Sequence, residues 1–235
     1  PRHGRGHSLA PSDIPARANI YALKSLGVER IVSISAVGSL RHKIQPLHLV
    51  IPDQLIDRTS SRDNSFFEEG IVAHVAMADP YCPVLRRAIL QSVDIDNIRT
   101  HDSGTCVVID GPQFSTRAES TLYRSWGADI IGMTALPEAK LAREAEICYA
   151  TMAFVTDYDC WNEAEEDVSV EVVIANVQKN VTTAQSIIRQ LVTKIPSKRE
   201  CKCPSALRNA IVTKLEAIPE VTRHRLSLII DKYVA

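Results

Sequence analysis

Two aspartates, Asp157 and Asp159, follow the longest apolar run of the chain, residues 147–156. Side chains two positions apart on a strand point the same way, so both carboxyl groups are expected to face one site. At the end of an apolar strand they are partly removed from water and repel each other, which raises one of the two pKa values. A carboxyl group that stays protonated near neutral pH can donate a proton to a leaving group. The alternative is a pair of solvated turn aspartates, one of which caps a helix.

The chain opens with a basic stretch that contains glycines, RHGRGH at residues 2–7. Cations, together with glycines that let backbone N–H groups approach a ligand, favour binding of an anion such as phosphate. Zinc binding by His3 and His7 is not expected, because two glycines interrupt their helical spacing. A frayed basic terminus is the alternative interpretation.

Other short segments are suited to the same pocket. The sequence SAVGS at residues 35–39 follows a buried strand, and its hydroxyl and close backbone turn could hold a second face of the anion. Turns of Gly and Ser are common, so this segment alone is a weak indication. Aromatic rings for a base, an apolar contact for a sugar and hydroxyls for oxyanions are supplied by Phe114-Ser115, Met133-Thr134 and Trp161. Each of these residues, taken singly, is also an ordinary core or capping residue.

Six cysteines, at positions 82, 106, 148, 160, 201 and 203, are too sparse for a secreted disulfide scaffold. Cys106 and Cys148 lie in apolar runs, where a thiol behaves as a small hydrophobic group. The segment 201–203 has two cysteines but no second pair to complete a zinc site, so we expect a surface loop and no metal site. This use of cysteine indicates a reducing, intracellular compartment.

Composition excludes several classes of protein. The 27 Lys and Arg against 28 Asp and Glu leave a formal net charge of 27 − 28 = −1, which argues against a general nucleic-acid binder. With 45% hydrophobic and 23% charged residues, the chain of 235 residues has an ordinary globular composition and a length that suits one domain. No apolar run approaches the ~18 residues of a membrane helix, and no signal peptide opens the chain. We therefore expect no membrane and no nucleic acid among its partners.

Helical and extended patterns alternate along the chain, which is typical of an α/β fold with a mostly parallel sheet and ligands at the carboxyl ends of its strands. A polar loop is expected at 57–70, long enough to be functional. The strand at 49–56 should be bent at Pro52. Strands are expected at 31–35, 49–56, 105–110, 129–133 and 147–156, and helices at 16–26, 83–92, 117–126, from 137 onward, 168–195 and 226–233.

Seven segments together carry a family resemblance that spreads from Pro1 to about Val173: PRHGRGH, SAVGSL, DQLIDRT, ADPYCP, GPQFSTRAES, MTALPEAKLAREAEICYA and TDYDCW. As a set they resemble the S-methyl-5'-thioadenosine phosphorylases of the purine nucleoside phosphorylase superfamily. The resemblance implies an α/β fold of one domain, with a mixed central β-sheet flanked by helices. It covers residues 1–195 and leaves 196–235 as a divergent tail. Family members begin upstream with strands and a glycine-rich turn, so we expect a chain that lacks those N-terminal strands.

The resemblance implies reversible phosphorolysis of S-methyl-5'-thioadenosine to adenine and 5-methylthioribose 1-phosphate, a salvage reaction of a pentosyltransferase. Asp157 is then the general acid that protonates the purine at N7. Asp159 accepts from the 6-amino group, and Ser115 favours adenine over 6-oxopurines. The remaining implied roles are phosphate binding by Arg2, His3, Ser35, Ala36 and Thr134, ribose contact by Met133, purine contact by Phe114, methylthio contact by Val170 and Val173, and a contact of His74 with the 5' position in a neighbouring subunit.

The same resemblance implies a homotrimer in the cytoplasm, with the nucleus as a second compartment. No metal and no organic cofactor are expected, and inorganic phosphate is the co-substrate. Two alternatives stay open. One is a truncated paralogue that binds nucleoside without catalysis, and the other is a phosphorylase of another purine nucleoside, against which Asp157 in place of Asn counts.

Overall fold

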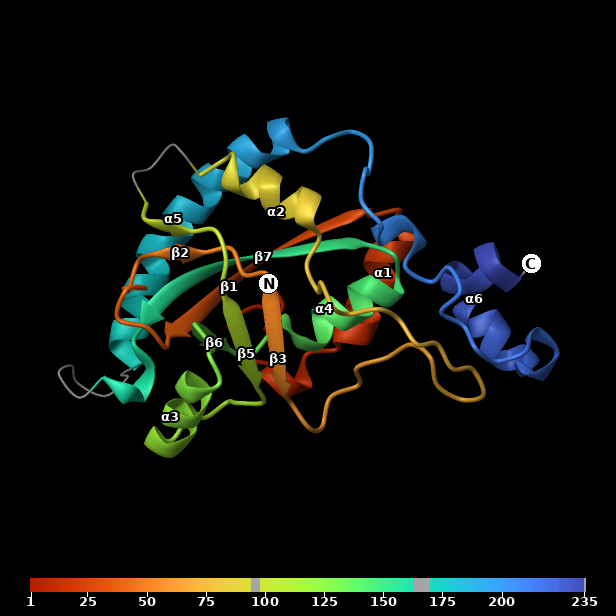
Figure 1. Cartoon of the computed structure of the whole chain (residues 1–235), viewed down its shortest axis with the longest axis horizontal. Coiled ribbons are helices and arrows are strands. Elements are labelled where there is room, and N and C mark those ends of the chain that lie inside the picture. Colours follow the sequence, from red (N-terminus) through yellow and green to blue (C-terminus); the bar gives the residue numbers. More distant parts are fainter. Residues whose placement is uncertain (94–97, 163–169, 235) are drawn as a thin grey trace.

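The structure, a computed structural model, describes residues 1–93, 98–162 and 170–234, and of residues 170 and 172 it describes the backbone alone. Within these ranges a seven-stranded sheet has the strand order β3-β5-β6-β1-β7-β2-β4 (Figure 1). Its strands are β1 (Arg30–Ser39), β2 (Leu49–Val50), β3 (Gln54–Arg58), β4 (Thr100–His101), β5 (Thr105–Ile109), β6 (Ile130–Gly132) and β7 (Cys148–Asp157).

The sheet is mixed, which confirms the fold class. Strand β1 pairs in parallel with β7 along most of its length and antiparallel with β6 near its end. The outer pairs β2–β4, β3–β5 and β5–β6 are parallel, and β2 pairs antiparallel with β7. The helices around the sheet are α1 (Ala16–Ser25), α2 (Pro83–Leu90), α3 (Arg117–Ser125), α4 (Ala135–Glu144), α5 (Val170–Lys194) and α6 (Glu220–Val234).

Strand β7 shows how the sheet is covered, because its residues alternate between two apolar clusters. Cys148, Met152 and Phe154 pack in one cluster with residues of α2 and α5. Tyr149 and Val155 pack in the other, with residues of α1 and α4. In Figure 1, α2 lies above β7 and α4 below it, and α5 runs from above β7 down past its left end. Burial on both faces explains why this strand is the longest apolar run in the sequence.

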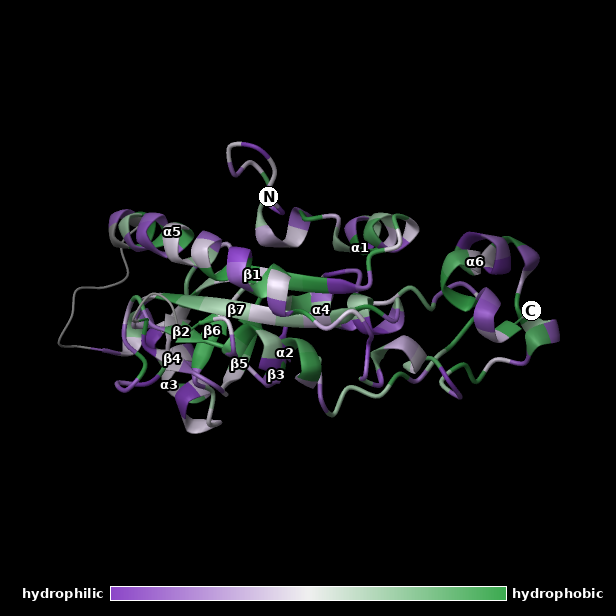
Figure 2. Cartoon of the chain, turned by 90° about the horizontal axis from the view of Figure 1, so that it is seen from above, coloured by the Kyte–Doolittle hydropathy of each residue, from purple (hydrophilic) through white to green (hydrophobic). Residues whose placement is uncertain are grey.

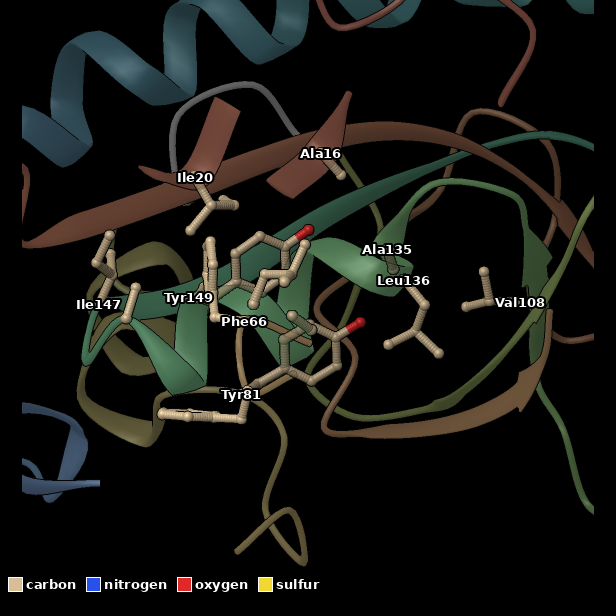
Figure 3. Close-up of a cluster of buried hydrophobic side chains, with 14 of the residues drawn as sticks. Ala16, Ile20, Phe66, Tyr81, Val108, Ala135, Leu136, Ile147 and Tyr149 are labelled. Carbon is tan, nitrogen blue, oxygen red and sulfur yellow. The ribbon is translucent and has the colours of Figure 1, made fainter. Parts of the chain in front are cut away.

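The larger cluster draws on segments that are far apart in the sequence. Figure 3 shows Ile20 of α1, Tyr149 of β7 and the loop residues Phe66 and Tyr81 gathered in it. The rings of Tyr81 and Tyr149 stack with centroids 6.0 Å apart. Figure 2 shows hydrophobic residues along much of the central strands, whereas the surrounding helices carry hydrophobic and hydrophilic residues in turn. None of the described helices has the length and apolar character needed to cross a lipid bilayer.

The predicted strand at 49–56 is wrong in one respect. It is two strands, β2 and β3, which lie in different parts of the sheet: β2 pairs with β7 and β4, whereas β3 pairs with β5 at the opposite edge. Pro52 lies between them, and because it has no N–H it cannot continue a ladder. The short β4 was not predicted, and α6 begins at Glu220 rather than at 226.

The last segment of the chain, from residue 196, packs on the same core. Leu207, Ile218 and Leu226 belong to the larger cluster, and Lys232 forms an ion pair of 3.0 Å with the buried Glu146. In Figures 1 and 2, α6 lies at the end of the molecule remote from α3. The division into a phosphorylase domain, 1–195, and a divergent tail, 196–235, stays a prediction.

One prediction about the cysteines is wrong. Cys203 is 3% exposed rather than part of a surface loop, and its sulfur lies near those of Cys82, Cys148 and Cys201. The second pair that the local sequence lacks is thus supplied by the fold, from α2 and β7. Cys106 and Cys148 are buried as predicted.

The loop from 59 to 70 is fixed to the sheet by Arg62, whose side chain is 3% exposed. Its guanidinium donates to the backbone carbonyls of Met133 and Leu136 at 2.6 Å, of Asp110 at 2.7 Å and of Ile109 at 3.3 Å. It thereby joins the segment after β5 to the start of α4. A buried carbonyl that loses its donor costs about 1–3 kcal/mol, so this residue is expected to matter for stability.

Replacing Arg62 by methionine, Arg62→Met, keeps an apolar stem and removes these donors. We expect the free energy of unfolding, measured by urea denaturation, to fall by roughly 2–4 kcal/mol. The control is Arg87→Met on the exposed side of α2, which should change it by less than about 0.5 kcal/mol. Similar values for the two variants would remove Arg62 from this role.

Candidate active site

A cavity of about 400 Å³ lies where β1, β6 and β7 approach the N-terminal segment. It brings together most of the residues that the sequence indicates for a site. Those that line it are Arg2, His3, Ser35, Ala36, Phe114, Ser115, Met133, Thr134, Asp157, Asp159 and Val173. Segments separated by more than a hundred residues therefore share one pocket.

Arg2 is held in place by a buried acid that the sequence did not single out. Its Nε and Nη2 donate to the Glu138 carboxylate at 2.7 and 3.1 Å, and further bonds go to Ser33 Oγ and the Ile34 carbonyl. Burial alone would lower the pKa of Arg2, but the charge and hydrogen bonds of Glu138 outweigh it and raise that pKa. Four of the five guanidinium N–H donors are thus used, and one at Nη1 remains for a ligand.

His3 lies beside Arg2 with its imidazole in a defined tautomer. Its Nδ1 is 2.9 Å from the Leu9 carbonyl oxygen, which accepts only, so Nδ1 carries a proton. Burial lowers the pKa of His3, with His7 and Arg2 adding to the effect and the Leu9 carbonyl opposing it. His7 stacks on His3 with ring centroids 4.2 Å apart and also lines the cavity. The ring nitrogen Nε2 of His3 is therefore the atom available to an anion.

Two hydroxyls complete this side of the cavity. Ser35 Oγ on β1 is 3.3 Å from Thr134 Oγ1, at the start of α4, although 99 positions separate the two residues. Ala36 is exposed on β1 and lines the same cavity. Neighbouring hydroxyls beside an arginine and a histidine suit a tetrahedral oxyanion.

The other side of the cavity is set by an irregularity in the β1–β7 ladder. Val37 pairs with Val155 but Gly38 pairs with Asp157, so Thr156 is an extra residue in β7. A bulge of this kind redirects the side chain that follows it. Gly38 makes room for the result: a Cβ at this position would lie 2.9 Å from Asp157 Oδ1 and 3.0 Å from Ile131 Cγ2.

Asp157 is held by a donor on each oxygen. Thr156 Oγ1 donates to Oδ2 at 2.7 Å, and the backbone N–H of Asp159 donates to Oδ1 at 2.8 Å. Burial nevertheless raises the pKa of Asp157, because it outweighs these two bonds. The carboxyl group is therefore easier to protonate than an ordinary aspartate.

Asp159 is 7% exposed, and its backbone φ of 53° lies in the left-handed region that few L-residues adopt. Burial raises its pKa to about 6, helped by the charge of Asp157 and opposed by the nearby hydroxyls of Ser120 and Ser115. Its Oδ2 and both serine hydroxyls lack a well-aligned hydrogen bond among the described residues. The two aspartates converge through the bulge and the turn at Tyr158 rather than through strand alternation, since β7 ends at Asp157.

Apolar side chains line the space between the two polar groups. Met133 and Phe114 do so from the loops after β6 and β5, and Val173 from α5. Val177, one helical turn further along α5, lines the cavity too and was not predicted. Phe114 is 44% exposed, which leaves its ring available for stacking.

Three predicted residues stand apart from this pocket. Trp161 does not line it: its Nε1 donates to the Ser39 carbonyl at 2.7 Å and its ring lies 3.5 Å from the Arg124 guanidinium. His74 is exposed, lies outside the cavity of its own chain and donates its backbone N–H to the Ala210 carbonyl. The backbone of Val170 begins α5, and its side chain lies outside the described part of the chain.

Comparison with known sequences decides the family. The profile of the Phosphorylase superfamily matches residues 1–193. An S-methyl-5'-thioadenosine phosphorylase of Geobacter sulfurreducens is 55% identical over 235 residues, which are 100% of this chain and 82% of that protein. One of Koribacter versatilis is 53% identical over 232 residues, 99% of this chain and 80% of that protein. This chain belongs to the S-methyl-5'-thioadenosine phosphorylase family.

Solved structures agree with the S-methyl-5'-thioadenosine phosphorylase fold. A methylthioadenosine phosphorylase from an antarctic soil metagenomic library superposes with a TM-score of 0.90 at 53% identity, over 97% of this chain and 81% of that one. The methylthioadenosine phosphorylase of Schistosoma mansoni in complex with adenine gives 0.83 at 35% identity, over 94% and 82%. A variant of the adenosine/methylthioadenosine phosphorylase from the same organism, in complex with methylthioadenosine, gives 0.77 at 36% identity, over 85% and 76%.

The close approach at Gly38 gives a test of this pocket. In Gly38→Ala the new methyl group must displace Asp157, and a misplacement of about 1 Å can cost ~10²-fold in turnover. The matched control is Gly104→Ala, whose methyl group would meet Val50 Cγ1 at 3.1 Å away from the cavity. Activity and the free energy of unfolding are measured for both variants. We expect a large loss of activity in Gly38→Ala alone, beyond what any loss of stability explains. Equal losses that follow stability would contradict the role of Gly38.

Proposed function

We propose that this cavity catalyses reversible phosphorolysis of S-methyl-5'-thioadenosine, in which inorganic phosphate displaces adenine and forms 5-methylthioribose 1-phosphate. The observation that carries the proposal is that one cavity holds a cluster of a cation and hydroxyls together with a pair of buried carboxyl groups. Ser35 belongs to the first group, and Gly38 lies against Asp157 of the second group. Ser35 and Gly38 lie three residues apart along β1, about 10 Å. That span suits a nucleoside whose C1' lies between an attacking phosphate and the leaving purine.

Phosphate is assigned to the side of Arg2, His3, Ser35, Ala36 and Thr134. The Glu138 carboxylate neutralises much of the Arg2 charge and leaves one Nη1 donor, so Arg2 orients the anion more than it attracts it. Further positive charge can come from His3. An anion at Nε2 favours a proton there, against the burial that lowers the pKa of His3.

Adenine is assigned to the side of Asp157 and Asp159, with Phe114 against its face. As the bond between C1' and N9 breaks, the purine takes up negative charge, and the proton of Asp157 passes to N7. The sugar passes through an oxocarbenium-like state that the phosphate oxygen then captures at C1'. Asp159 accepts from the 6-amino group, whereas a 6-oxo group would place two acceptors against each other. Ser115 lies beside Asp159 and supports this choice of base.

Met133 is assigned to the ribose, and Val170 and Val173 to the methylthio group. We also propose a homotrimer in which His74 reaches the 5' position of a neighbouring subunit, which is consistent with its exposed position. Phosphate is the co-substrate, and the assigned steps require no organic cofactor. A phosphorylase of other purine nucleosides is the alternative function.

The proposal is tested by phosphate-dependent release of adenine from S-methyl-5'-thioadenosine, with inosine as the competing substrate. We expect kcat/KM for the first to exceed that for inosine by at least about 10²-fold, because inosine leaves Asp159 facing an oxo group. A preference for inosine would favour the alternative function, and hydrolysis that does not depend on phosphate would contradict phosphorolysis.

Asp157→Asn keeps the shape of the side chain but cannot deliver a proton. Turnover is expected to fall by ~10²-fold or more, the size of a lost general acid. Asp231→Asn, an exposed carboxylate on α6, is the control and should leave turnover unchanged.

The pH profile separates an acid from a merely positioning residue. Burial raises the pKa of Asp157, so its protonated form persists to higher pH than that of an ordinary aspartate, and the rate should fall as the pH rises through this raised pKa. In Asp157→Asn this descending limb should be lost. A limb that persists unchanged in the variant would remove Asp157 from the role of acid.

His74 is tested by shared sites. Subunits that carry His74→Ala, coexpressed with subunits that carry Asp157→Asn, form some sites with both native residues when each site spans two subunits. Random assembly of equal amounts should restore about a quarter of the sites in a cyclic assembly. Mixed assemblies no more active than their parents would contradict a site shared through His74.

A further inference from the structure

Four cysteine sulfurs meet outside the catalytic cavity. Cys82 precedes the first turn of α2, Cys148 is the first residue of β7, and Cys201 and Cys203 lie in the segment that follows α5. All four Sγ atoms lie within 4.8 Å of one another, and those of Cys148 and Cys201 are 3.4 Å apart. None of these residues lines the cavity assigned to substrate.

We propose that Cys82, Cys148, Cys201 and Cys203 bind a single structural Zn²⁺ ion. Zinc takes four thiolates at the corners of a tetrahedron, with Zn–S distances of ~2.3 Å, and this places the sulfurs about 3.8 Å from one another. The upper limit of 4.8 Å on all six separations, and the 3.4 Å between Cys148 and Cys201, are compatible with that spacing. Cysteines that hold a cluster of several irons bind different iron atoms and are spread more widely.

The arrangement also differs from that of two disulfides. A disulfide needs each sulfur to approach a single partner, whereas here each sulfur lies near the three others. All four cysteines are free thiols, and Cys82, Cys148 and Cys203 are 1–3% exposed. A compact group of four thiols is typical of ligands for one thiophilic ion.

The surroundings of the cluster suit a thiolate site. The backbone N–H of Leu85, in the first turn of α2, lies near the sulfur of Cys82, where it can help to orient a thiolate ligand. Lys198 precedes the segment 201–203 and Lys202 lies within it, and the two can offset part of the negative charge of four thiolates. Arg199 is instead ion-paired with Glu29 at 3.1 Å, and position 200 is a glutamate. Apolar residues of α2 and α5, including Leu85 and Leu191, pack around the cluster and limit access of water.

The site would be structural because four protein ligands leave no position for substrate. It joins α2, β7 and the segment 201–203. That segment continues into the tail, whose Ala210 carbonyl accepts from the backbone N–H of His74. Arg30 supports the same junction with hydrogen bonds to the carbonyls of Pro196 and Ser197 at 2.7 and 3.2 Å. Removal of the ion should therefore lower Tm before it changes the chemistry of the pocket.

The experiment is elemental analysis of the full chain, purified under reducing conditions without chelator or a metal-binding tag. We expect about one zinc ion per chain. Cys148→Ser and Cys203→Ser should each lower zinc content by about tenfold or more, since each removes one of four ligands. Cys106→Ala is the matched control, a buried cysteine in the other cluster, and should keep its zinc.

A second measurement covers variants that fail to fold. The native chain, stripped of metal with a chelator and kept reduced, is titrated with Co²⁺, which should give the visible absorption of a tetrahedral four-thiolate site and raise Tm. Three results would overturn the proposal: iron in place of zinc, full zinc content in Cys203→Ser, or an intact mass lower by the hydrogens of disulfides in metal-free protein purified without reductant.

Discussion

The parallel pairing of β1 with β7 is the constraint on which the rest of the structure depends. The ladder runs from Arg30 beside Cys148 to Gly38 beside Asp157, through the middle of the sheet. Its two faces carry the two main apolar clusters, so every helix contact with β7 presupposes it. The same pairing positions Cys148 and Asp157 at opposite ends of β7. The packing of the core and the geometry of the pocket therefore both depend on the register of the β1–β7 pair.

The register is broken at one place, and that break makes the pocket. Without the extra residue Thr156, alternation along β7 would direct Asp157 to the other face of the sheet. The bulge redirects Asp157 into the pocket. The free energy lost with the interrupted ladder is offset by the hydroxyl of Thr156, which is in hydrogen-bond contact with the Val37 carbonyl and with the Asp157 carboxyl group. The carboxyl group remains partly desolvated, and a raised pKa follows from burial rather than from any single neighbour. The position of this carboxyl group and its raised pKa thus both follow from the bulge and from the burial that accompanies it.

Local patterns were sufficient to predict much of this. The apolar run before Asp157 and Asp159, the basic segment at Arg2 and the segment 35–39 each predicted part of a site, and the structure brings residues of all three into one cavity. The turn expected at 35–39 was wrong, because β1 continues to Ser39. Glu138, which holds Arg2, and Gly38, which leaves room for Asp157, were missed because their roles depend on contacts across 136 and 119 positions of the sequence. Trp161 was assigned to the pocket because it follows Asp159 closely in the sequence. Its ring instead packs against the guanidinium of Arg124, outside the pocket.

The cysteines show the same limit in its clearest form. A metal site is recognised in a sequence when its ligands come in closely spaced pairs, because a short loop then fixes two of them. Here Cys201 and Cys203 form such a pair, but Cys82 and Cys148 stand alone, and only the placement of α2 beside the start of β7 brings their sulfurs together. The cluster of four sulfurs is a property of the folded sheet and not of any single segment. An ion held there would stabilise the junction of three segments that the sheet has already positioned, which is why its binding and the folding of the tail should be coupled.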